Sequence, residues 1–367
     1  MSSRVRFTAA GDIVVRDRLY KNGVPVHRDY EKTMAYLRAG DVVWGSCEVQ
    51  FSTAGHRTDA PIAYLVDPAV AEDLGRAGFN LMTVATNHTR DFGIGAFLDT
   101  ISHLDRAGIA TVGGGQDLAA AQAPRIVEVG GTKLGIIAVS CLLPPDYAAM
   151  ADRPGISPVR VEQWPEIHPV LLATEPGAPM KMRSRAVPED VQQLIGQIER
   201  LRPNVDVLIV SVHWGYGRGN PRAEYQQPLG HALIEAGADM ILGNHPHSPA
   251  GIETYRGKPI LYSLGNHIAQ QDWVNATPVQ KDIFSQIDPW SMVCSISIED
   301  GRIAQMEFRA TQCNSEGMPV LIDDEEEAAP VLSDFQHLSA TLGTEMLIDG
   351  ARMVCHFEPR QRIGATA

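Results

Sequence analysis

Two histidines lie one residue apart in the stretch Gly-Asn-His-Pro-His at residues 243–247. This stretch directly follows a short hydrophobic segment, residues 240–242, which is typical of a buried strand. On a tight loop stiffened by proline, His245 and His247 can face a common point. Neutral imidazole nitrogen is a good ligand for zinc, manganese or iron. A lone buried histidine is more often structural, but two in this setting favour a metal site.

Four more hydrophobic segments end at a residue that can bind a metal or move a proton. Three of them end at Asp12, Glu48 and His213, and the fourth ends at Asn87 followed by His88. Loops at the carboxyl ends of strands converge over one edge of an α/β sheet, so we expect these side chains to meet. Alone, Asp12 is better explained as a turn or helix cap, and His213 equally well as a core residue. Together the strand ends predict a metal site with the ligands Asp12, Glu48, Asn87, His213, His245 and His247.

This set of carboxylate, amide and imidazole groups can hold one divalent ion, or two that share a carboxylate, and lower the pKa of bound water to about 7. We expect manganese, zinc or iron. His88 can then protonate a leaving group, and Asp91 can orient its imidazole. We count Asp12 as catalytic as well as metal-binding. Three arginines near these motifs can grip a phosphate or carboxylate of the substrate: Arg90, Arg218 and Arg222.

The overall charge narrows the class of partner. The 367 residues include 31 Lys and Arg against 44 Asp and Glu, a formal net charge of −13. Nucleic acids and anionic membranes reward clustered basic residues, so we expect neither as a partner. The sequence shows no apolar leader and no stretch of about 20 apolar residues. Five scattered cysteines without a C-x-x-C pair complete the prediction of a cytoplasmic protein with reduced thiols.

Hydrophobic runs alternate with amphipathic stretches along the chain, which predicts a layered α/β fold. The spacing predicts helices over residues 68–77, 95–107, 188–201 and 227–236. Glycine after the first two, at Gly78 and Gly108, favours a helix end there. Three hairpins are expected, with turns at Gly130-Gly131, Arg256-Gly257 and Asp300-Gly301.

Two regions depart from this alternation. Residues 142–187 are rich in proline and carry the basic residues Lys181, Arg183 and Arg185. Loops this long are uncommon in compact domains and often cover or shape a site; the alternative is a surface elaboration without a role. The acidic run at residues 323–327 is expected to be a solvated linker before a C-terminal helix. We therefore predict a main domain, residues 1–320, that contains the insertion, and a C-terminal extension, residues 321–367.

At these positions the chain resembles the CapA family of capsule-synthesis proteins, whose domain is similar to calcineurin-type metallophosphoesterases. The resemblance rests on short stretches in the family's order, at residues 7–12, 40–48, 86–93, 210–215, 242–247 and 260–266. It implies a four-layer α/β/β/α sandwich of the metallophosphoesterase type. It also implies His88 as the catalytic acid and a metal site formed by Asp12, Glu48, Asn87, His213, His245 and His247.

Three departures from the family's pattern bear on the metal site. Val14 stands where phosphoesterases usually carry a histidine, so one ligand of a two-metal site is missing. Ser46 and Cys47 precede Glu48 where the family has Asn-Leu, which removes an amide. His267 follows Leu-Gly-Asn where the family has phenylalanine, and we expect this imidazole to compensate as a ligand or to belong to the substrate pocket.

The sequence supports three hypotheses for function. The first is a metal-dependent hydrolase that directs water at an amide, ester or phosphoester bond of a small or peptide-like substrate. In the second, the same pocket works without metal as an isomerase or epimerase. The third is a non-catalytic protein that binds poly-γ-glutamate through the basic stretch at residues 181–185. Metal content separates the first two hypotheses.

Overall fold

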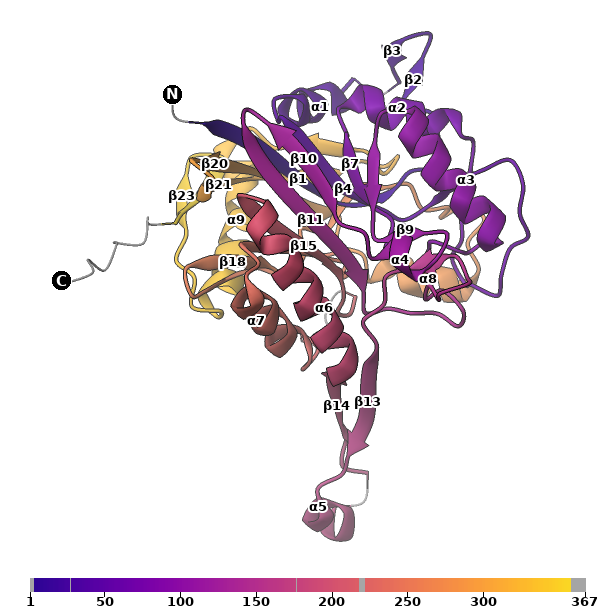
Figure 1. Cartoon of the computed structure of the whole chain (residues 1–367), viewed down its shortest axis with the longest axis vertical. Helices are drawn as coiled ribbons and strands as arrows, with labels where there is room; N and C mark the ends of the chain where they lie inside the picture. The colour runs from indigo at the N-terminus through magenta and orange to yellow at the C-terminus, as the bar shows by residue number, and fades with distance from the viewer. Residues whose placement is uncertain (1–2, 27, 176, 218–221, 358–367) are drawn as a thin grey trace, which may run out of the picture.

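The computed structural model describes residues 3–26, 28–175, 177–217 and 222–357, and two large β-sheets dominate it (Figure 1). The ten-stranded sheet has the order β23 (Leu347–Asp349), β24 (Arg352–His356), β21 (Arg302–Cys313), β20 (Trp290–Glu299), β1 (Arg4–Val14), β4 (Val42–Cys47), β7 (Leu81–Thr83) and β8 (Ala110–Val112), with β19 (Asn266–Ala269) beside β1 and β22 (Pro319–Leu321) beside β21. The six-stranded sheet has the order β10 (Arg125–Val129), β11 (Thr132–Ser140), β15 (Val207–His213), β16 (Met240–Asn244), β18 (Lys258–Leu261) and β17 (Ile252–Tyr255).

Short strand pairs and helices complete the described part of the chain. The pairs are β2 (Tyr20–Lys21) with β3 (Val24–Pro25), β5 (Gln50–Phe51) with β6 (Leu65–Val66), β9 (Gly114–Gly115) with β12 (Gly155–Ile156), and β13 (Val161–Glu166) with β14 (Lys181–Ala186). The helices are α1 (Tyr30–Arg38), α2 (Ala69–Ala77), α3 (Gly93–Arg106), α4 (Leu118–Ala121), α5 (Pro169–Thr174), α6 (Pro188–Leu201), the 3₁₀ turn η1 (Arg202–Asn204), α7 (Gln226–Ala236), α8 (Pro278–Ser285) and α9 (Glu325–Ala340).

Both sheets contain a run of parallel strands, and helices connect all of them except β16 and β18, which are connected through β17. In the larger sheet, β1, β4, β7 and β8 are parallel neighbours, and α1, α2 and α3 make the connections between them. In the smaller sheet, β11, β15, β16 and β18 are parallel neighbours. Parallel strands need such crossovers, and their carboxyl ends then share one sheet edge. The two runs thus give each sheet an edge on which loop residues collect.

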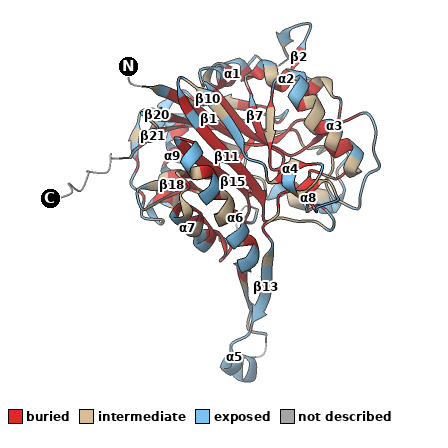
Figure 2. Cartoon of the chain, viewed as in Figure 1, coloured by how far each residue is buried: buried red, intermediate tan, exposed pale blue. Residues whose placement is uncertain are grey.

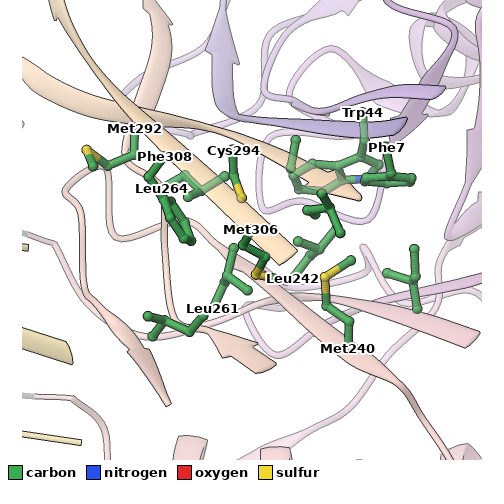
Figure 3. Close-up of a cluster of buried hydrophobic side chains, with 14 of the residues drawn as sticks. Phe7, Trp44, Met240, Leu242, Leu261, Leu264, Met292, Cys294, Met306 and Phe308 are labelled. Carbon is green, nitrogen blue, oxygen red and sulfur yellow. The ribbon is translucent and has the colours of Figure 1, made fainter. Parts of the chain in front are cut away.

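The principal hydrophobic core lies between the two sheets. Phe7 on β1 and Trp44 on β4 meet Met240 and Leu242 on β16 in this cluster (Figure 3). All four side chains are at most 1% exposed. Successive residues of a strand point to opposite faces of the sheet. Val43, next to Trp44, and Ile241, between Met240 and Leu242, therefore point away from this core and pack against the helices.

Helices cover the outward faces of the sheets. Apolar residues of α1, α2 and α3, such as Met34, Leu74 and Phe97, pack on the larger sheet. Those of α6 and α7, such as Leu194 and Leu233, pack on the smaller one. Figure 2 shows the consequence: the sheet strands are largely buried, whereas the helices expose one side.

Most of the predicted elements are present. The helices predicted over 68–77, 95–107, 188–201 and 227–236 correspond to α2, α3, α6 and α7, with ends that differ by at most two residues. Helix α2 ends at Gly78, whose φ of 117° is of the kind that glycine adopts readily. The three predicted hairpins are confirmed as β10–β11, β17–β18 and β20–β21.

The predicted C-terminal helix is present as α9, but it begins inside the acidic run that was expected to be a linker. Asp324 caps α9 by accepting hydrogen bonds from the backbone N–H groups of Glu326 and Glu327, so most of the acidic run forms the first turn of a helix. Acidic residues stabilise a helix N-terminus. Beyond the helix, β24 pairs with β21 and extends the larger sheet, so the boundary predicted at residue 320 falls inside one continuous fold.

The insertion at residues 142–187 has two parts. Its first part, up to Val159, returns along the body, where Ser140 pairs with Pro158 and β12 pairs with β9. Its second part is a hairpin arm, β13 and β14 with α5 at the tip, which projects away from both sheets (Figure 1). The arm is almost wholly exposed (Figure 2).

The structure also bears on membrane association and on the cysteines. In the ranges described above, no helix combines the length and the apolar character needed to cross a bilayer. All five cysteines are free thiols, and four of them are buried.

Candidate active site

Three residues that are far apart in the sequence form the centre of the site. Asp12 lies on β1, Glu48 directly follows β4, and His213 ends β15. One ligand atom from each lies within 4.8 Å of the others, and all three residues are at most 2% exposed. The two carboxylates come from the larger sheet and the imidazole from the smaller one. The predicted meeting of strand ends therefore occurs between two sheets rather than along one.

The loop after β16 adds two imidazoles to this centre. The His245 backbone N–H faces both oxygens of Asp12, at 3.3 and 3.1 Å, and His247 Nδ1 lies 3.3 Å from Asp12 Oδ2. The His245 ring centroid is 4.9 Å from that of His213 and 5.5 Å from that of His247. Both loop histidines have positive φ, 94° and 53°, which is costly for residues other than glycine. Such strain is found where a site fixes side-chain directions.

Amide groups complete the arrangement around His213. Its Nε2 lies 2.7 Å from Asn87 Oδ1, and its Nδ1 lies 3.2 Å from Asn244 Oδ1 and 3.6 Å from Glu48 Oε1. A further amide, Asn266 Oδ1, lies 2.8 Å from His247 Nδ1. All six residues predicted as ligands thus belong to one connected cluster. Asn244 and Asn266 were not predicted, although both lie inside motifs that the sequence analysis had singled out.

Burial and close packing shift the pKa values of several groups in the cluster. Burial and the nearby Asp12 carboxylate raise the pKa of Glu48 well above its ordinary value. Burial, together with neighbouring imidazoles, lowers the pKa of both His213 and His245, which favours their neutral, ligating form. Burial alone would lower the pKa of His247 too, but its contact with Asp12 outweighs this and raises it.

Two buried atoms of the predicted ligands have unmet bonding capacity. Within the described residues, neither Glu48 Oε2 nor His245 Nδ1 has a hydrogen-bond partner. Buried polar atoms are costly when unsatisfied and are usually paired. Carboxylate oxygens and neutral imidazole nitrogens are suitable ligands for a divalent ion such as manganese, zinc or iron. The donor set therefore fits a metal ion on the chemistry of its own residues.

A hydrogen-bonded chain of three residues flanks the centre. His88 Nδ1 lies 2.7 Å from Asp91 Oδ2, as expected for an orienting carboxylate. The other oxygen, Asp91 Oδ1, accepts a 2.7 Å hydrogen bond from the hydroxyl of Tyr147. Burial and the Asp91 carboxylate raise the pKa of Tyr147, so this hydroxyl remains a donor. Tyr147 lies in the first part of the insertion and was not predicted, because no sequence pattern marks it.

A cavity of about 610 Å³ opens above the cluster. Glu48, Asn87, His88, His245 and His247 line it, and so does Val14. Its other walls come from the loop between β5 and β6, from the insertion around Pro144 and Pro145, and from the end of α8. The volume falls within the usual range for small-molecule sites.

Two of the three predicted arginines, Arg90 and Arg222, do not line this cavity. The Arg90 guanidinium lies over the Tyr147 ring at 5.7 Å and donates to the Asp146 carbonyl. Arg222 lies over the Tyr262 ring at 5.2 Å. Neither side chain lines the cavity. Arg218 lies outside the described residues.

His267 requires a correction. His267 is next to Asn266 on β19, and neighbouring residues of a strand point to opposite faces of the sheet. Because Asn266 faces the site, His267 points away from it. It is fully buried, between Tyr30 at 6.1 Å and Phe79 at 5.8 Å, and neither ring nitrogen has a partner among the described residues. Burial lowers its pKa to about 3. The prediction that His267 is a ligand or a substrate residue is therefore wrong.

Comparison with known proteins identifies the family. Residues 6–271 match the family described as bacterial capsule synthesis protein PGA_cap. The chain belongs to this family. All six predicted metal ligands, His88 and Tyr147 lie inside the matched region.

Several curated relatives are similar to the chain. A probable polyglutamine synthesis accessory protein of Mycobacterium tuberculosis is 35% identical over 62% of this chain and 55% of its own length. The PGA biosynthesis protein CapA of Bacillus subtilis is 26% identical over 65% of this chain and 55% of its own. The capsule biosynthesis protein CapA of Bacillus anthracis is 24% identical over 74% and 61%. The chain thus spans about half the length of the first of these relatives.

Solved structures add little to this family membership. A hypothetical protein from Thermus thermophilus is similar over 84% of this chain and 99% of its own, with a TM-score of 0.45 and 15% identity. At that level of similarity we draw no functional conclusion from it.

Proposed function

We propose that this protein is a metal-dependent hydrolase that acts on an amide, ester or phosphoester bond of a small or peptide-like substrate. The observation that carries the proposal is the convergence of Asp12, Glu48 and His213 from two sheets, with Glu48 Oε2 left without a partner among the described residues. We further propose that the helices and two sheets form the four-layer α/β/β/α sandwich of the metallophosphoesterase type.

The residues that would hold the metal are the six already described: Asp12, Glu48, Asn87, His213, His245 and His247. A divalent ion in such a site polarises the oxygen of a scissile bond and lowers the pKa of a neighbouring water. Val14, buried and apolar, contributes no ligand at the position where phosphoesterases carry a histidine. The cluster supports one ion more directly than two.

His88 is proposed as the general acid. Asp91 occupies the Nδ1 side of its ring, so the Nε2 nitrogen is left to serve the cavity that His88 lines. A proton held at Nε2 can pass to the oxygen or nitrogen of a leaving group. Asp91, held in turn by Tyr147, keeps the ring in this orientation.

The basic stretch at residues 181–185 gives little support to polyglutamate binding. Lys181 lies 3.7 Å from Glu224, Arg183 contacts both Glu166 and Glu224, and Arg185 lies 2.7 Å from Glu162. Each cation therefore already has a carboxylate partner on or beside the arm. A polyanion would have to displace these partners.

Elemental analysis of protein purified without an affinity tag tests the proposal. We expect bound manganese, zinc or iron, hydrolysis of at least one p-nitrophenyl ester, anilide or phosphate, and loss of that activity with a chelator. A content below about 0.2 ion per chain, together with activity that a chelator leaves intact, would overturn the proposal. It would favour the metal-free acid–base alternative.

A further inference from the structure

The walls of the active-site cavity are mostly apolar. Ile62 and Tyr64 come from the loop between β5 and β6, and Pro144 and Pro145 come from the insertion. Ile283 on α8 and the nearby Ile287 form a further part of the lining. Three separate segments therefore place hydrocarbon around the space above the metal ligands.

Three carboxylates line this cavity, beside the imidazoles of the site. They are Glu48, Asp59 and Asp91. Among the lining residues that the structure describes there is neither a lysine nor an arginine. Phosphates and carboxylates are normally gripped by such cations, above all by arginine. An anionic substrate would have to rely on the bound metal ion alone, because none of the described lining residues is a lysine or arginine that could hold its remaining charge.

Two arginines that contact cavity-lining tyrosines are engaged elsewhere. Arg16 lies 5.2 Å over the ring of Tyr64, but its guanidinium pairs with Asp272 at 3.4 Å. Arg90 packs on Tyr147 and donates to the Asp146 carbonyl. Both side chains support cavity-lining tyrosines from behind, and neither one lines the cavity itself.

From these observations we infer that the substrate is an uncharged ester or amide that carries an apolar group, and that phosphates and γ-glutamyl chains are selected against. The inference rests on the proposed hydrolytic function. Water adds its oxygen to the acyl carbon, and the C–O or C–N bond breaks. The departing alcohol or amine takes the proton of His88 Nε2, and the proton lost from water restores the imidazole. The apolar group of the substrate fills the hydrocarbon part of the cavity.

A series of p-nitrophenyl esters tests this selectivity in the metal-loaded protein. We expect kcat/KM to rise about fourfold for each methylene added from acetyl to butyryl to hexanoyl, because each is buried against the wall. p-Nitrophenyl phosphate should react at least about 100-fold more slowly than the hexanoyl ester, and the anionic N-acetyl-γ-glutamyl-p-nitroanilide at least about 100-fold more slowly than hexanoyl-p-nitroanilide. A flat series, or a preference for either anionic compound, would overturn the inference.

Two lysine substitutions on α8 provide a matched pair. Ile283→Lys places a cation in the cavity wall, whereas Val279→Lys changes a residue that is 63% exposed and lines a different surface hollow. We expect I283K to lower kcat/KM for the hexanoyl ester by about tenfold or more, and to raise the relative rate of the anionic compounds. V279K should behave as the parent does. Equal effects of both variants would contradict the assignment of the wall.

Binding to the metal-free protein separates this inference from the proposed reaction. Titration calorimetry with hexanamide and with a γ-glutamyl pentamer should show binding of the first only, weakened in I283K and unchanged in V279K. If hexanamide binds but no ester or anilide is turned over, the proposed hydrolysis fails and the apolar preference stands. If the pentamer binds better than hexanamide, the preference fails whatever the catalytic result.

Discussion

The ten-stranded sheet brings carboxylates to the site, whereas the six-stranded sheet brings imidazoles. Asp12 and Glu48 belong to the first group, and His213, His245 and His247 belong to the second. Neither sheet alone presents a complete set of ligands. Asn87 extends from the acidic side to the imidazole of His213, at 2.7 Å, and so joins the two groups.

This difference shows why the site depends on the packing of the two sheets. Two adjacent buried carboxylates repel each other, and a group of buried imidazoles resists protonation, as the pKa shifts of Glu48 and His213 indicate. Burial of the carboxylates and of the imidazoles would become favourable if both groups bound the same cation. The apolar core between the sheets, with Phe7 and Met240 among its residues, holds the two groups in register.

The largest expected effect comes from removing one ligand on each side. Glu48→Gln and His213→Asn should each lower the activity on the order of a thousandfold or more and reduce the metal content. Glu253→Gln is the matched control, because Glu253 is a buried carboxylate that pairs with His231 and Tyr262 outside the site. Metal-free E48Q should be at least as stable as the metal-free parent, since one of two adjacent buried negative charges is gone. Retention of metal by E48Q or H213N would show that only one sheet binds the ion.

His88→Ala tests the proposed general acid. His88 lies in the loop after β7 of the ten-stranded sheet and is not one of the proposed metal ligands. We expect kcat to fall by about 10²- to 10⁴-fold while the metal content stays unchanged. The loss should be greater for an anilide than for a p-nitrophenyl ester, because the anilide nitrogen needs a proton to leave. Equal losses for both substrates would argue against an acid role.

His267→Phe tests a buried imidazole of the larger sheet that points away from the site. The pKa of His267 is about 3 in the folded protein and near 6.5 in the unfolded chain. As the pH falls below 6.5, the unfolded chain therefore takes up a proton that the folded protein does not, and the free energy of unfolding decreases. Because of this histidine, the free energy of unfolding of the parent protein should be about 2 kcal/mol lower at pH 5 than at pH 7. Urea unfolding at both pH values should show that H267F lacks this part of the loss. Parallel pH dependence in the two proteins would mean that His267 is solvated.

The smallest expected effect comes from Tyr147→Phe, which removes the hydroxyl that holds Asp91. We expect kcat to fall about three- to tenfold, with KM and metal content unchanged, the range for one hydrogen bond. Tyr64→Phe is the control, since Tyr64 lines the same cavity while its hydroxyl accepts from the Asp272 backbone. A change in KM instead of kcat would assign Tyr147 to substrate binding.

Sequence alone predicted the strand ends better than the directions of individual side chains. The six residues predicted as ligands lie together because each ends or follows a hydrophobic run, a pattern that the parallel strands require. The choice between Asn266 and His267 depends on which face of β19 meets the site, and that is set by pairing with β1. The sequence pattern of four residues does not reveal it. His267 was therefore misassigned and Asn266 overlooked.

Long-range contacts account for the other differences. Tyr147 lies 56 residues from Asp91 in a proline-rich stretch without periodicity, so only the folded chain brings the two together. The acidic run near residue 324 was taken for a linker because charge alone does not distinguish a solvated loop from the first turn of a helix. Asp324 as N-cap, with three glutamates after it, is a signal that could have corrected this.

The hairpin arm has a practical consequence for protein engineering. Its two strands leave and re-enter the body side by side, with Val161 opposite Ala186, and they remain paired as far as Glu166 and Lys181. Exposed loop tips of this kind tolerate foreign sequence best. A fluorescent domain, an affinity handle or new chain ends made by circular permutation can thus be placed at the tip without altering the path of the backbone through the catalytic centre.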